Sequence, residues 1–268
     1  MSQNSSNPTS ETAIAPAEQK PMKKSLKRRI LLCIGLPLWV FLGFMLAQAI
    51  VIVVIEVLQN MGVPLGEINP SIFQVAAGGI VYALSLLIVI GAPWLIKKSR
   101  TTKEELGIQR LPTWLDIVWV PAGAIVYLIL TALISAFAMA FLTFVDYGQT
   151  QDTGFSNISA QSEYIMAFLM LVIIAPIAEE LLFRGYLFGK LRKHAPIWVS
   201  ILITSVVFAV VHGAWNVGLD VFALSIVLCL LRVVSKSLWP SILLHMMKNS
   251  IAFYFLFINP TVLSTLGG

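Results

Sequence analysis

The sequence predicts an all-α, polytopic integral membrane protein, a helical bundle of about seven transmembrane helices, with six or eight as alternatives. Three observations predict this class. Hydrophobic residues make up 58% of the 268 residues and charged residues only 12%, whereas soluble domains have roughly 45–50% and about 25%. The mean hydropathy is +0.87. Apolar runs of about 20 residues recur along the chain. A soluble enzyme, a disordered tail protein and a disulfide-stapled secreted module are excluded.

Seven apolar runs are candidates for membrane helices. The first follows a basic block and is too long for the apolar core of a signal peptide, so we interpret it as a helix anchored by that block. The fifth and sixth runs are short and barely separated, so they could be tilted, or one could be partly re-entrant. The expected spans are residues 30–57, 72–96, 116–143, 164–188, 197–212, 217–232 and 239–258.

The remaining segments are read from their composition. Residues 1–28 are expected to form a disordered cytoplasmic tail that ends in the basic anchor, because their polar composition cannot bury enough apolar surface to fold. Residues 29–162 form a first group of transmembrane helices, and residues 259–268 a short C-terminal tail.

The net charge of +5 is explained by membrane topology. Apart from Arg184 and Lys248, all Lys and Arg residues fall on the tail and on alternate loops. The other loops, around residues 58–71, 144–163 and 213–219, contain no Lys or Arg. The positive-inside rule then places the N-terminus in the cytoplasm, and an odd number of spans places the C-terminus outside. We expect a bacterial plasma membrane protein with no nucleic-acid partner.

Charged side chains inside the fourth span are the first candidate site residues, because such charges are costly in lipid unless paired or hydrated. The i, i+4 spacing puts Glu180 and Arg184 on one helix face, where they can neutralise each other. Glu179 points in a different direction and is left as the less paired carboxylate, a candidate general base. The alternative is that Glu180 and Arg184 form a purely structural ion pair.

Polar residues in the fifth and seventh spans extend this candidate site. His212 ends the fifth span, and His245 and Asn249 share one face of the seventh. Each alone could be an interhelical hydrogen bond, and Phe208 alone is expected to pack in the core. At 1.5 Å per residue, Glu180 and His245 lie at matching depths of about 15 and 13 Å. His212, about 24 Å along a straight helix, fits only if that helix tilts or begins below the membrane surface.

Other polar or reactive residues receive simpler interpretations. His194 lies in a basic loop and is expected to belong to the cytoplasmic anchor. Asp220, near the outer edge of the sixth span, is expected to face water. Lys248 either lines a cavity or pairs with a carboxylate. Cys33 and Cys229 lie in apolar runs and are expected to act as small hydrophobic residues.

Three motifs in a fixed order resemble the CPBP family, which joins type II CAAX prenyl proteases with bacteriocin-processing and Abi-type membrane proteins. The motifs are Glu-Glu-x-x-x-Arg at residues 179–184, Phe-x-x-x-His at 208–212 and His-x-x-x-Asn at 245–249. A softer similarity is Glu-Glu-Leu-Gly-Ile at 104–108. The resemblance covers about residues 163–258, which we interpret as a CPBP-type catalytic membrane core.

The resemblance implies an intramembrane endopeptidase that acts on a membrane-embedded or lipidated peptide or protein in the lipid bilayer. By analogy, Glu179 and His212 would activate the attacking water. His245 and Asn249 would donate hydrogen bonds to the developing oxyanion. The implied catalytic residues are Glu179, Glu180, His212, His245 and Asn249, with Arg184 and Phe208 as structural support.

Two alternatives to this reading stay open. No cofactor is favoured, but zinc is possible, because Glu179, Glu180, His212 and His245 could bind it and leave one position for water. Against zinc, the chain has no H-E-x-x-H helix; Gly-x-Gly-Asp and Gly-x-Ser-x-Gly motifs of other proteases are also missing. The second alternative is a non-catalytic membrane protein, such as a bacteriocin immunity factor, a scaffold or a small transporter, because intramembrane charges also mark ion and substrate pathways.

Overall fold

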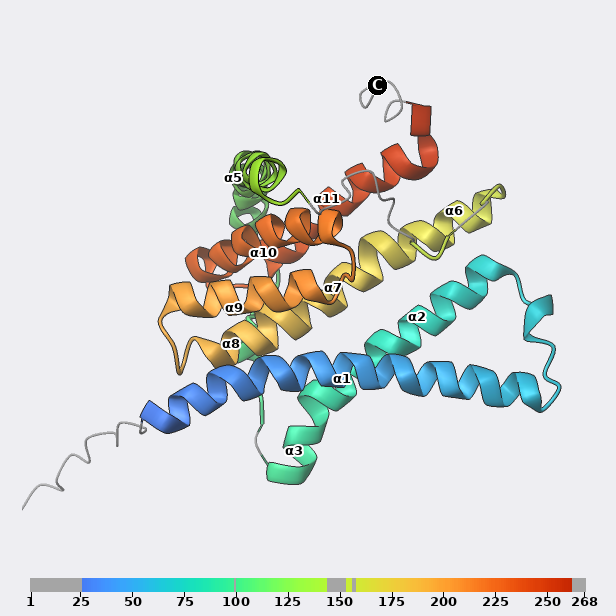
Figure 1. Ribbon diagram of the computed structural model, residues 1–268, viewed down its shortest axis with the longest axis horizontal. Helices are drawn as coiled ribbons and strands as arrows, with labels where there is room; N and C mark the ends of the chain where they lie inside the picture. The colour runs from blue at the N-terminus through green and yellow to red at the C-terminus, as the bar shows by residue number, and fades with distance from the viewer. Residues whose placement is uncertain (1–25, 99, 144–152, 156–157, 262–268) are drawn as a thin grey trace, which may run out of the picture.

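The computed structural model describes residues 26–98, 100–143, 153–155 and 158–261. These residues form helices and contain no strand (Figure 1). The expected tail up to residue 25, most of the 144–163 loop and the C-terminal tail from residue 262 lie outside the described residues. The α-helices are α1 (Leu26–Asn60), α2 (Pro70–Leu86), α3 (Ala92–Lys97), α4 (Lys103–Leu106), α5 (Trp114–Phe141), α6 (Gln161–Phe168), α7 (Ala175–Glu180), α8 (Phe188–Leu191), α9 (Ile197–Val210), α10 (Trp215–Ser235) and α11 (Trp239–Phe253). The 3₁₀ turn η1 (Leu65–Glu67) and the π-helical segments η2 (Leu87–Gly91), η3 (Leu169–Ile174), η4 (Leu181–Leu187) and η5 (Tyr254–Ile258) complete the described elements.

Six helical stretches among the described residues are long and apolar enough to cross a membrane. They confirm the predicted polytopic membrane bundle, and their ends lie within four residues of six predicted spans. These stretches are Leu26–Asn60, Pro70–Ile96, Trp114–Phe141, Gln161–Leu191, Trp215–Ser235 and Trp239–Ile258.

The remaining predicted span, the fifth (residues 197–212), is the short helix α9. It has 14 residues, or about 21 Å at 1.5 Å per residue, against a hydrocarbon core of about 30 Å. Figure 1 shows the turn between α9 and α10 beside α7, within the length of the bundle, and not at the end where α1 turns into α2. The short α9 therefore favours the alternative that the fifth run only partly enters the membrane over a loop at residues 213–219 that reaches the outer end.

Stretches of π-helix interrupt the second and fourth spans, and a proline stands two positions after the end of each of the first two. Pro93 follows η2, and Pro176 follows η3. Proline has no N–H to donate, and a π turn releases carbonyl groups from the regular helical ladder. Two side chains bind carbonyls in these segments: Trp39 Nε1 donates to the carbonyl of Val89 at 3.0 Å, and Asn249 Nδ2 to that of Leu171 at 2.8 Å. The irregular segments are thus connected to neighbouring helices by side-chain hydrogen bonds.

A short connector around α4 joins several helices at one end of the bundle. Thr102 caps α4, and Gly107, with φ of 83°, ends it. The backbone carbonyls of Glu104 and Glu105 accept hydrogen bonds from Arg232 Nη2 on α10, and the carbonyl of Gly107 accepts one from Leu238 just before α11. The connector therefore aligns the ends of the two helices that follow α9.

The Glu105 side chain fixes the same connector to α8. Its carboxylate accepts hydrogen bonds from Lys190 Nζ at 2.6 Å and from Lys193 Nζ. Burial raises the pKa of Glu105, but the two ammonium groups outweigh it and hold the pKa below its usual value. A Cβ atom at Gly189 would lie 2.5 Å from the backbone oxygen of Glu105, so glycine is required for this close approach.

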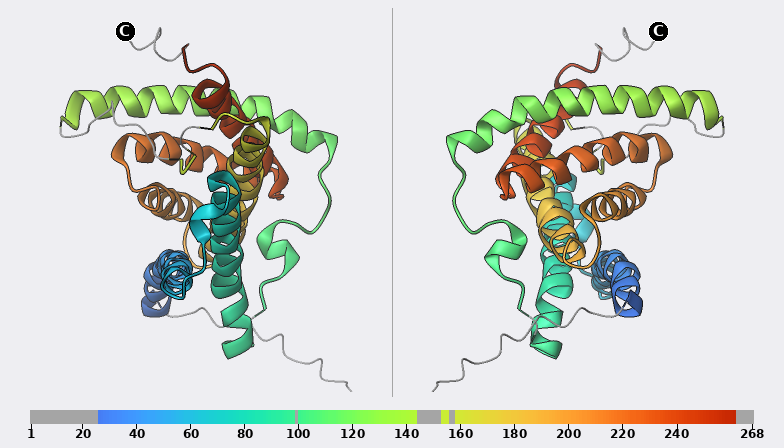
Figure 2. Two further views of the ribbon diagram at one scale, coloured as in Figure 1. Left: turned by 90° about the vertical axis from the view of Figure 1, so that its right-hand side faces the viewer. Right: turned by 90° about the vertical axis from the view of Figure 1, so that its left-hand side faces the viewer.

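Helix α5 lies across the bundle. It is seen almost end-on in Figure 1 and along its length in Figure 2, above α10 and α11. Its Val120 joins Leu224, Leu228 and Leu244 in a buried cluster. Gly123 lets α5 approach closely, because a Cβ atom there would lie 2.9 Å from Leu244. This helix therefore covers the outer side of α10 and α11 beside the cavity described next.

Candidate active site

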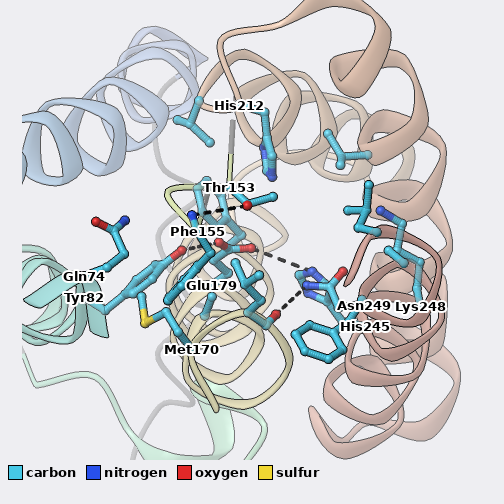
Figure 3. A pocket seen from close by; sticks show the side chains of 18 of the residues that line it. Gln74, Tyr82, Thr153, Phe155, Met170, Glu179, His212, His245, Lys248 and Asn249 are labelled. Carbon is cyan, nitrogen blue, oxygen red and sulfur yellow. Dashed lines mark hydrogen bonds and ion pairs between the residues drawn. The ribbon is translucent and has the colours of Figure 1, made fainter. Parts of the chain in front are cut away.

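A cavity of about 440 Å³ lies between α1, α2, the fourth span, α11 and the turn that follows α9. Its volume is within the range typical of ligand-binding pockets, about 300–1,000 Å³. Four residues predicted from the three motifs line it: Glu179, His212, His245 and Asn249. Figure 3 shows these side chains around one space. The fold thus brings together residues that lie up to 70 positions apart in the sequence.

Glu179 stands in the centre of the cavity in Figure 3, between α2 and α11. Its Oε1 accepts a hydrogen bond from Tyr82 Oη at 2.5 Å, and its Oε2 lies 3.8 Å from His245 Nε2. Tyr82 is a site residue that the sequence reasoning missed. The available signal was weak: a single tyrosine in an apolar span, outside any motif and 97 residues from its partner.

Glu180 is fully buried and has different partners from Glu179. Its Oε1 accepts a hydrogen bond from Arg184 Nη1 at 2.7 Å, as the i, i+4 spacing predicts. The same oxygen lies 2.9 Å from His245 Nδ1. Because a carboxylate can only accept, Nδ1 carries the hydrogen in this bond and Nε2 is left facing Glu179. One imidazole therefore sits between two carboxylates that are adjacent in the chain.

Phe208 is fully buried and packs against the polar residues of the site. The Arg184 guanidinium carbon lies 4.1 Å from the centre of its ring. The rings of His212 and His245 pack against it at 4.8 and 5.9 Å between centroids. Packing against one rigid aromatic ring sets the relative position of the guanidinium and both imidazoles.

His212 follows the last turn of α9. Its Nδ1 lies 2.7 Å from the carbonyl oxygen of Phe208, which can only accept a hydrogen bond. Nδ1 therefore carries a hydrogen, and Nε2 is free of this bond. The next residue, Gly213, has φ of 71°, a left-handed conformation that ends the helix at this point. From the sequence alone, His212 would lie too far along a straight helix to reach the other site residues. It reaches them because α9 stops inside the bundle.

Asn249 lines the cavity one turn after His245 and is also tied to the fourth span. Its Nδ2 donates to the carbonyl of Leu171, a residue of the π-helical segment η3. An amide nitrogen has two N–H groups, and this bond uses one of them. The oxyanion role of Asn249 stays a prediction that the geometry allows.

Asp220 and Lys248 form an ion pair beside the cavity. Their Oδ2 and Nζ atoms are 3.1 Å apart, and Lys248 also lines the cavity, so both alternatives for Lys248 hold. The expectation that Asp220 faces water holds only in part, because its side chain is 31% exposed but is also paired with Lys248. Its Oδ1 also accepts hydrogen bonds from Tyr127 and Thr131, because α5 lies over it.

The remaining predicted residues lie outside the cavity. The backbone carbonyl of His194 accepts a hydrogen bond from Arg29 Nε at 2.8 Å, which connects this loop with the basic start of α1. Cys33 and Cys229 are free thiols, and Cys229 is fully buried. Their predicted role as small hydrophobic residues is confirmed.

The four residues considered as zinc ligands do not present a metal site in this arrangement. Among the described residues, no group of three or more His, Cys, Asp or Glu side chains is placed to hold a metal ion. Glu180 Oε1 is bonded to Arg184, and the same oxygen holds His245 through Nδ1. A zinc site would require these two side chains to exchange their partners.

Fold and cavity together define a class: a polytopic membrane protein with a carboxylate–imidazole site enclosed by its helices. The family model described as "Type II CAAX prenyl endopeptidase Rce1-like" matches residues 161–251, which include all three motifs. The chain belongs to this Rce1-like CAAX prenyl endopeptidase family. It is accordingly a CAAX-type membrane protease in the general sense of that family.

Curated relatives extend the similarity beyond the matched region. The chain is 30% identical to the UPF0177 protein YxdF of Lactococcus lactis subsp. lactis (strain IL1403) over 133 residues, 50% of this chain and 69% of that protein. It is 26% identical to the membrane-embedded CAAX protease MroQ of Staphylococcus aureus (strain USA300) over 195 residues, 69% and 77% of the two chains. Bacillus subtilis (strain 168) YdiL, by name a candidate membrane peptidase, is 25% identical over 219 residues, 79% and 85% of the two chains. No solved structure matches this chain.

Proposed function

We propose that the protein is an intramembrane endopeptidase in which Glu179 activates water to hydrolyse a peptide bond of a membrane-embedded or lipidated substrate. One observation carries the proposal. The Glu179 carboxylate lies inside the cavity, held on one oxygen by Tyr82 and flanked on the other by His245 Nε2 at 3.8 Å. A carboxylate held in place but not neutralised by Arg or Lys can accept a proton from water.

The proposed reaction uses the groups around this carboxylate in sequence. A water molecule between Glu179 and His212 Nε2 gives one proton to Glu179 while its oxygen attacks the peptide carbonyl carbon. The second N–H of the Asn249 amide donates to the oxyanion, and His245 does so from Nε2 when it is protonated. The C–N bond then breaks, and Glu179 returns the proton to the leaving amine.

We further propose a bacterial plasma membrane location with the N-terminus in the cytoplasm. Hydrogen bonds join the basic segments at one end of the bundle: Arg29 binds the carbonyl of His194, and Glu105 binds Lys190 and Lys193. This gathering of basic segments supports the orientation that the positive-inside rule predicts. Cysteine accessibility labelling at Lys27→Cys and Glu67→Cys would test it, and labelling of Lys27→Cys only from outside the cell would contradict it.

The decisive test compares membrane peptides in cells that carry wild type, Glu179→Gln or His212→Ala. We expect both variants to insert and fold normally but to lose cleavage by about 10²–10⁴-fold, the usual contribution of general acid–base catalysis. Substrates should therefore accumulate. Glu56→Gln removes an exposed carboxylate from α1 and serves as the matched control. If both site variants keep full biological activity, a binding or immunity role replaces the protease.

Metal dependence is tested separately on purified active protein. We expect chelators to leave cleavage intact, because two of the four candidate zinc ligands, Glu180 and His245, are bonded to each other and Glu180 is also bonded to Arg184. Inactivation by a chelator with recovery on adding zinc would replace the glutamate mechanism with a metal mechanism.

A further inference from the structure

The cavity extends from Glu179 mainly in one direction. On α11 and η5 its lining residues run from His245 to Phe257, and on the fourth span they run from Phe183 back to Met170. Both series lead away from the connector around α4, toward the end of the bundle where α1 turns into α2 (Figure 1). A peptide segment next to the scissile bond therefore has room along this part of the cavity.

Two primary amides line the same part of the cavity. Gln48 on α1 and Gln74 on α2 are both half-buried and belong to its lining residues. Gln48 is about one turn after Phe44, whose ring centre is 6.1 Å from that of Tyr82. Gln74 is about two turns before Tyr82 on α2. Because α1 and α2 run in opposite directions, the two amides lie about 6 and 12 Å beyond Tyr82, at 1.5 Å per residue.

Helix packing does not explain these two amides. In the described part of the chain, neither Gln48 nor Gln74 has a hydrogen-bond partner. A polar side chain inside a membrane bundle usually forms a hydrogen bond to a neighbouring helix, as Asn249 does to the carbonyl of Leu171. Each primary amide offers two N–H donors and a carbonyl acceptor. The hydrogen-bonding groups of both glutamines are therefore available to a molecule in the cavity.

The glutamine of α2 and the predicted oxyanion donor of α11 lie on opposite walls of the cavity. Figure 3 shows Gln74 beside Tyr82 on α2, across the cavity from Asn249, with Glu179 between the two walls. The backbone groups of an extended strand point alternately to its two edges. A peptide that directs its scissile carbonyl toward Asn249 thus directs other peptide groups toward α1 and α2.

We propose that Gln48 and Gln74 bind backbone peptide groups of the substrate and so hold the segment on one side of the scissile bond in an extended conformation. This inference rests on the proposed function, whose site it deepens. A primary amide donates and accepts hydrogen bonds, as a peptide group does, and both glutamines are neutral, so the contact requires no charged group on the substrate. Inside a membrane, backbone groups released from a helix need such partners, because unpaired ones are costly.

The spacing of the two amides matches an extended chain. Their levels differ by about 6 Å, which is close to the rise of two strand residues at about 3.3 Å each. Peptide groups two residues apart point to the same edge of a strand. Gln48 and Gln74 should therefore contact peptide groups two residues apart, both within about five residues of the scissile bond.

The test replaces single peptide bonds of a synthetic apolar peptide by esters, one position at a time on both sides of the scissile bond, which itself stays unchanged. An ester keeps the side chains but removes the N–H donor and weakens the carbonyl acceptor, so it probes the backbone alone. Cleavage by the purified full-length protein in detergent micelles is measured by mass spectrometry. We expect kcat/KM to fall about 2- to 10-fold at two positions two residues apart on one side, the effect of one hydrogen bond at each.

Leucine variants assign each contact to its glutamine. Gln48→Leu should remove the ester penalty at the position nearer the scissile bond, and Gln74→Leu the penalty at the farther one. Leucine is close to glutamine in size and favourable in lipid, so both variants should insert and fold. Gln59→Leu changes an exposed glutamine of α1 and should keep both penalties. Equal cleavage of all esters and the parent peptide by wild type, or penalties that persist unchanged in both leucine variants, overturns the proposal.

A binding measurement separates this subsite from the proposed function. The unfolding temperature of Glu179→Gln is measured with the parent peptide and with each ester, whether or not wild type cleaves the parent. We expect the parent to raise the unfolding temperature more than the two sensitive esters do, and added Gln74→Leu to remove the difference at the farther position. Equal stabilisation by all peptides, or by none, sinks the glutamine subsite alone, whereas cleavage that persists in Glu179→Gln sinks the proposed catalytic role alone.

Discussion

The hydroxyl of Tyr82 lies 2.5 Å from Oε1 of Glu179, although 97 residues separate the two in the chain. Tyr82 belongs to α2, in the first group of membrane helices, whereas Glu179 belongs to the region with the three motifs. The proposed general base is thus held from outside its own sequence region. The first helices therefore contribute directly to the geometry of the site.

Replacing Tyr82 with Phe should slow cleavage about 10- to 100-fold, since a hydrogen bond to a charged group is worth about 1.5–3 kcal/mol. We expect kcat to fall more than KM rises, because the hydroxyl binds Glu179. Steady-state kinetics on a cleaved peptide measures this split. Tyr254→Phe, at a half-exposed tyrosine of η5, is the control. Wild-type kinetics in Tyr82→Phe would show that this hydrogen bond does not position the base.

Arg184→Met should destabilise the protein by about 3–5 kcal/mol, because it leaves the buried Glu180 carboxylate without its cation. Adding Glu180→Gln should restore much of the stability, since the lone charge is then gone. It should not restore cleavage, because His245 loses its carboxylate partner. Unfolding of the purified proteins in detergent measures the first effect. An Arg184→Met protein as stable as wild type would contradict the buried ion pair.

Glu105 should contribute stability that depends on pH. Its pKa is lower in the folded protein than usual, because Lys190 and Lys193 outweigh the effect of burial. A lowered carboxyl pKa stabilises the fold above the unfolded-state value of about 4.3, and this stabilisation is lost as pH falls through the folded value. Glu105→Gln should therefore lower the unfolding temperature at pH 7 and have little effect near pH 3.

The stabilisation is limited because Lys193 is half-exposed and water weakens its ion pair with Glu105. We expect this pair to contribute about 1 kcal/mol or less to the free energy of unfolding. Unfolding temperatures of wild type and Glu105→Gln between pH 3 and pH 8 measure it. Glu67→Gln changes an exposed carboxylate of η1 and provides the baseline. A difference between wild type and Glu105→Gln that grows toward low pH would be opposite to the prediction.

Gly189→Ala should displace the connector from α8. The added Cβ atom would lie 2.5 Å from the backbone oxygen of Glu105, and backbone cannot move aside as a flexible side chain can. We expect a loss of about 1–3 kcal/mol, the usual cost of overpacking. Gly35→Ala is the matched control, because a Cβ atom at Gly35 meets no atom within 4 Å. Thermal unfolding compares the two, and equal stability would show that the connector does not pack tightly at this point.

Local sequence properties were sufficient to predict most of the helices. Apolar runs mark the spans because crossing a bilayer demands about 20 apolar residues in a row. The Glu180–Arg184 ion pair was also predictable, since i, i+4 residues are neighbours on any helix. The length of α9 was predicted to within two residues, but its position was not, because the apolar run ending at His212 looks the same whether its helix crosses the membrane or stops within the bundle.

Contacts between distant segments could not be predicted. Nothing local connects Tyr82 with Glu179 or Asp220 with Tyr127, because each pair depends on how whole helices pack. The π-helical segment η3, whose Leu171 carbonyl accepts a hydrogen bond from Asn249, could not be predicted either, because it also depends on how the helices pack. Such a turn shifts the phase of the side chains that follow it, so helical spacing alone misplaces them.

The sequence by itself determined the membrane class, the approximate spans and the short set of polar residues that would form a site. It could do so because hydrophobicity and charge in lipid are constraints on each segment separately. Only the tertiary structure decided that His245 lies between Glu180 and Glu179, that Tyr82 donates a hydrogen bond to Glu179, and that Lys248 lines the cavity while its ammonium group pairs with Asp220. These relationships arise from helix packing, in which the positions of several segments are settled together.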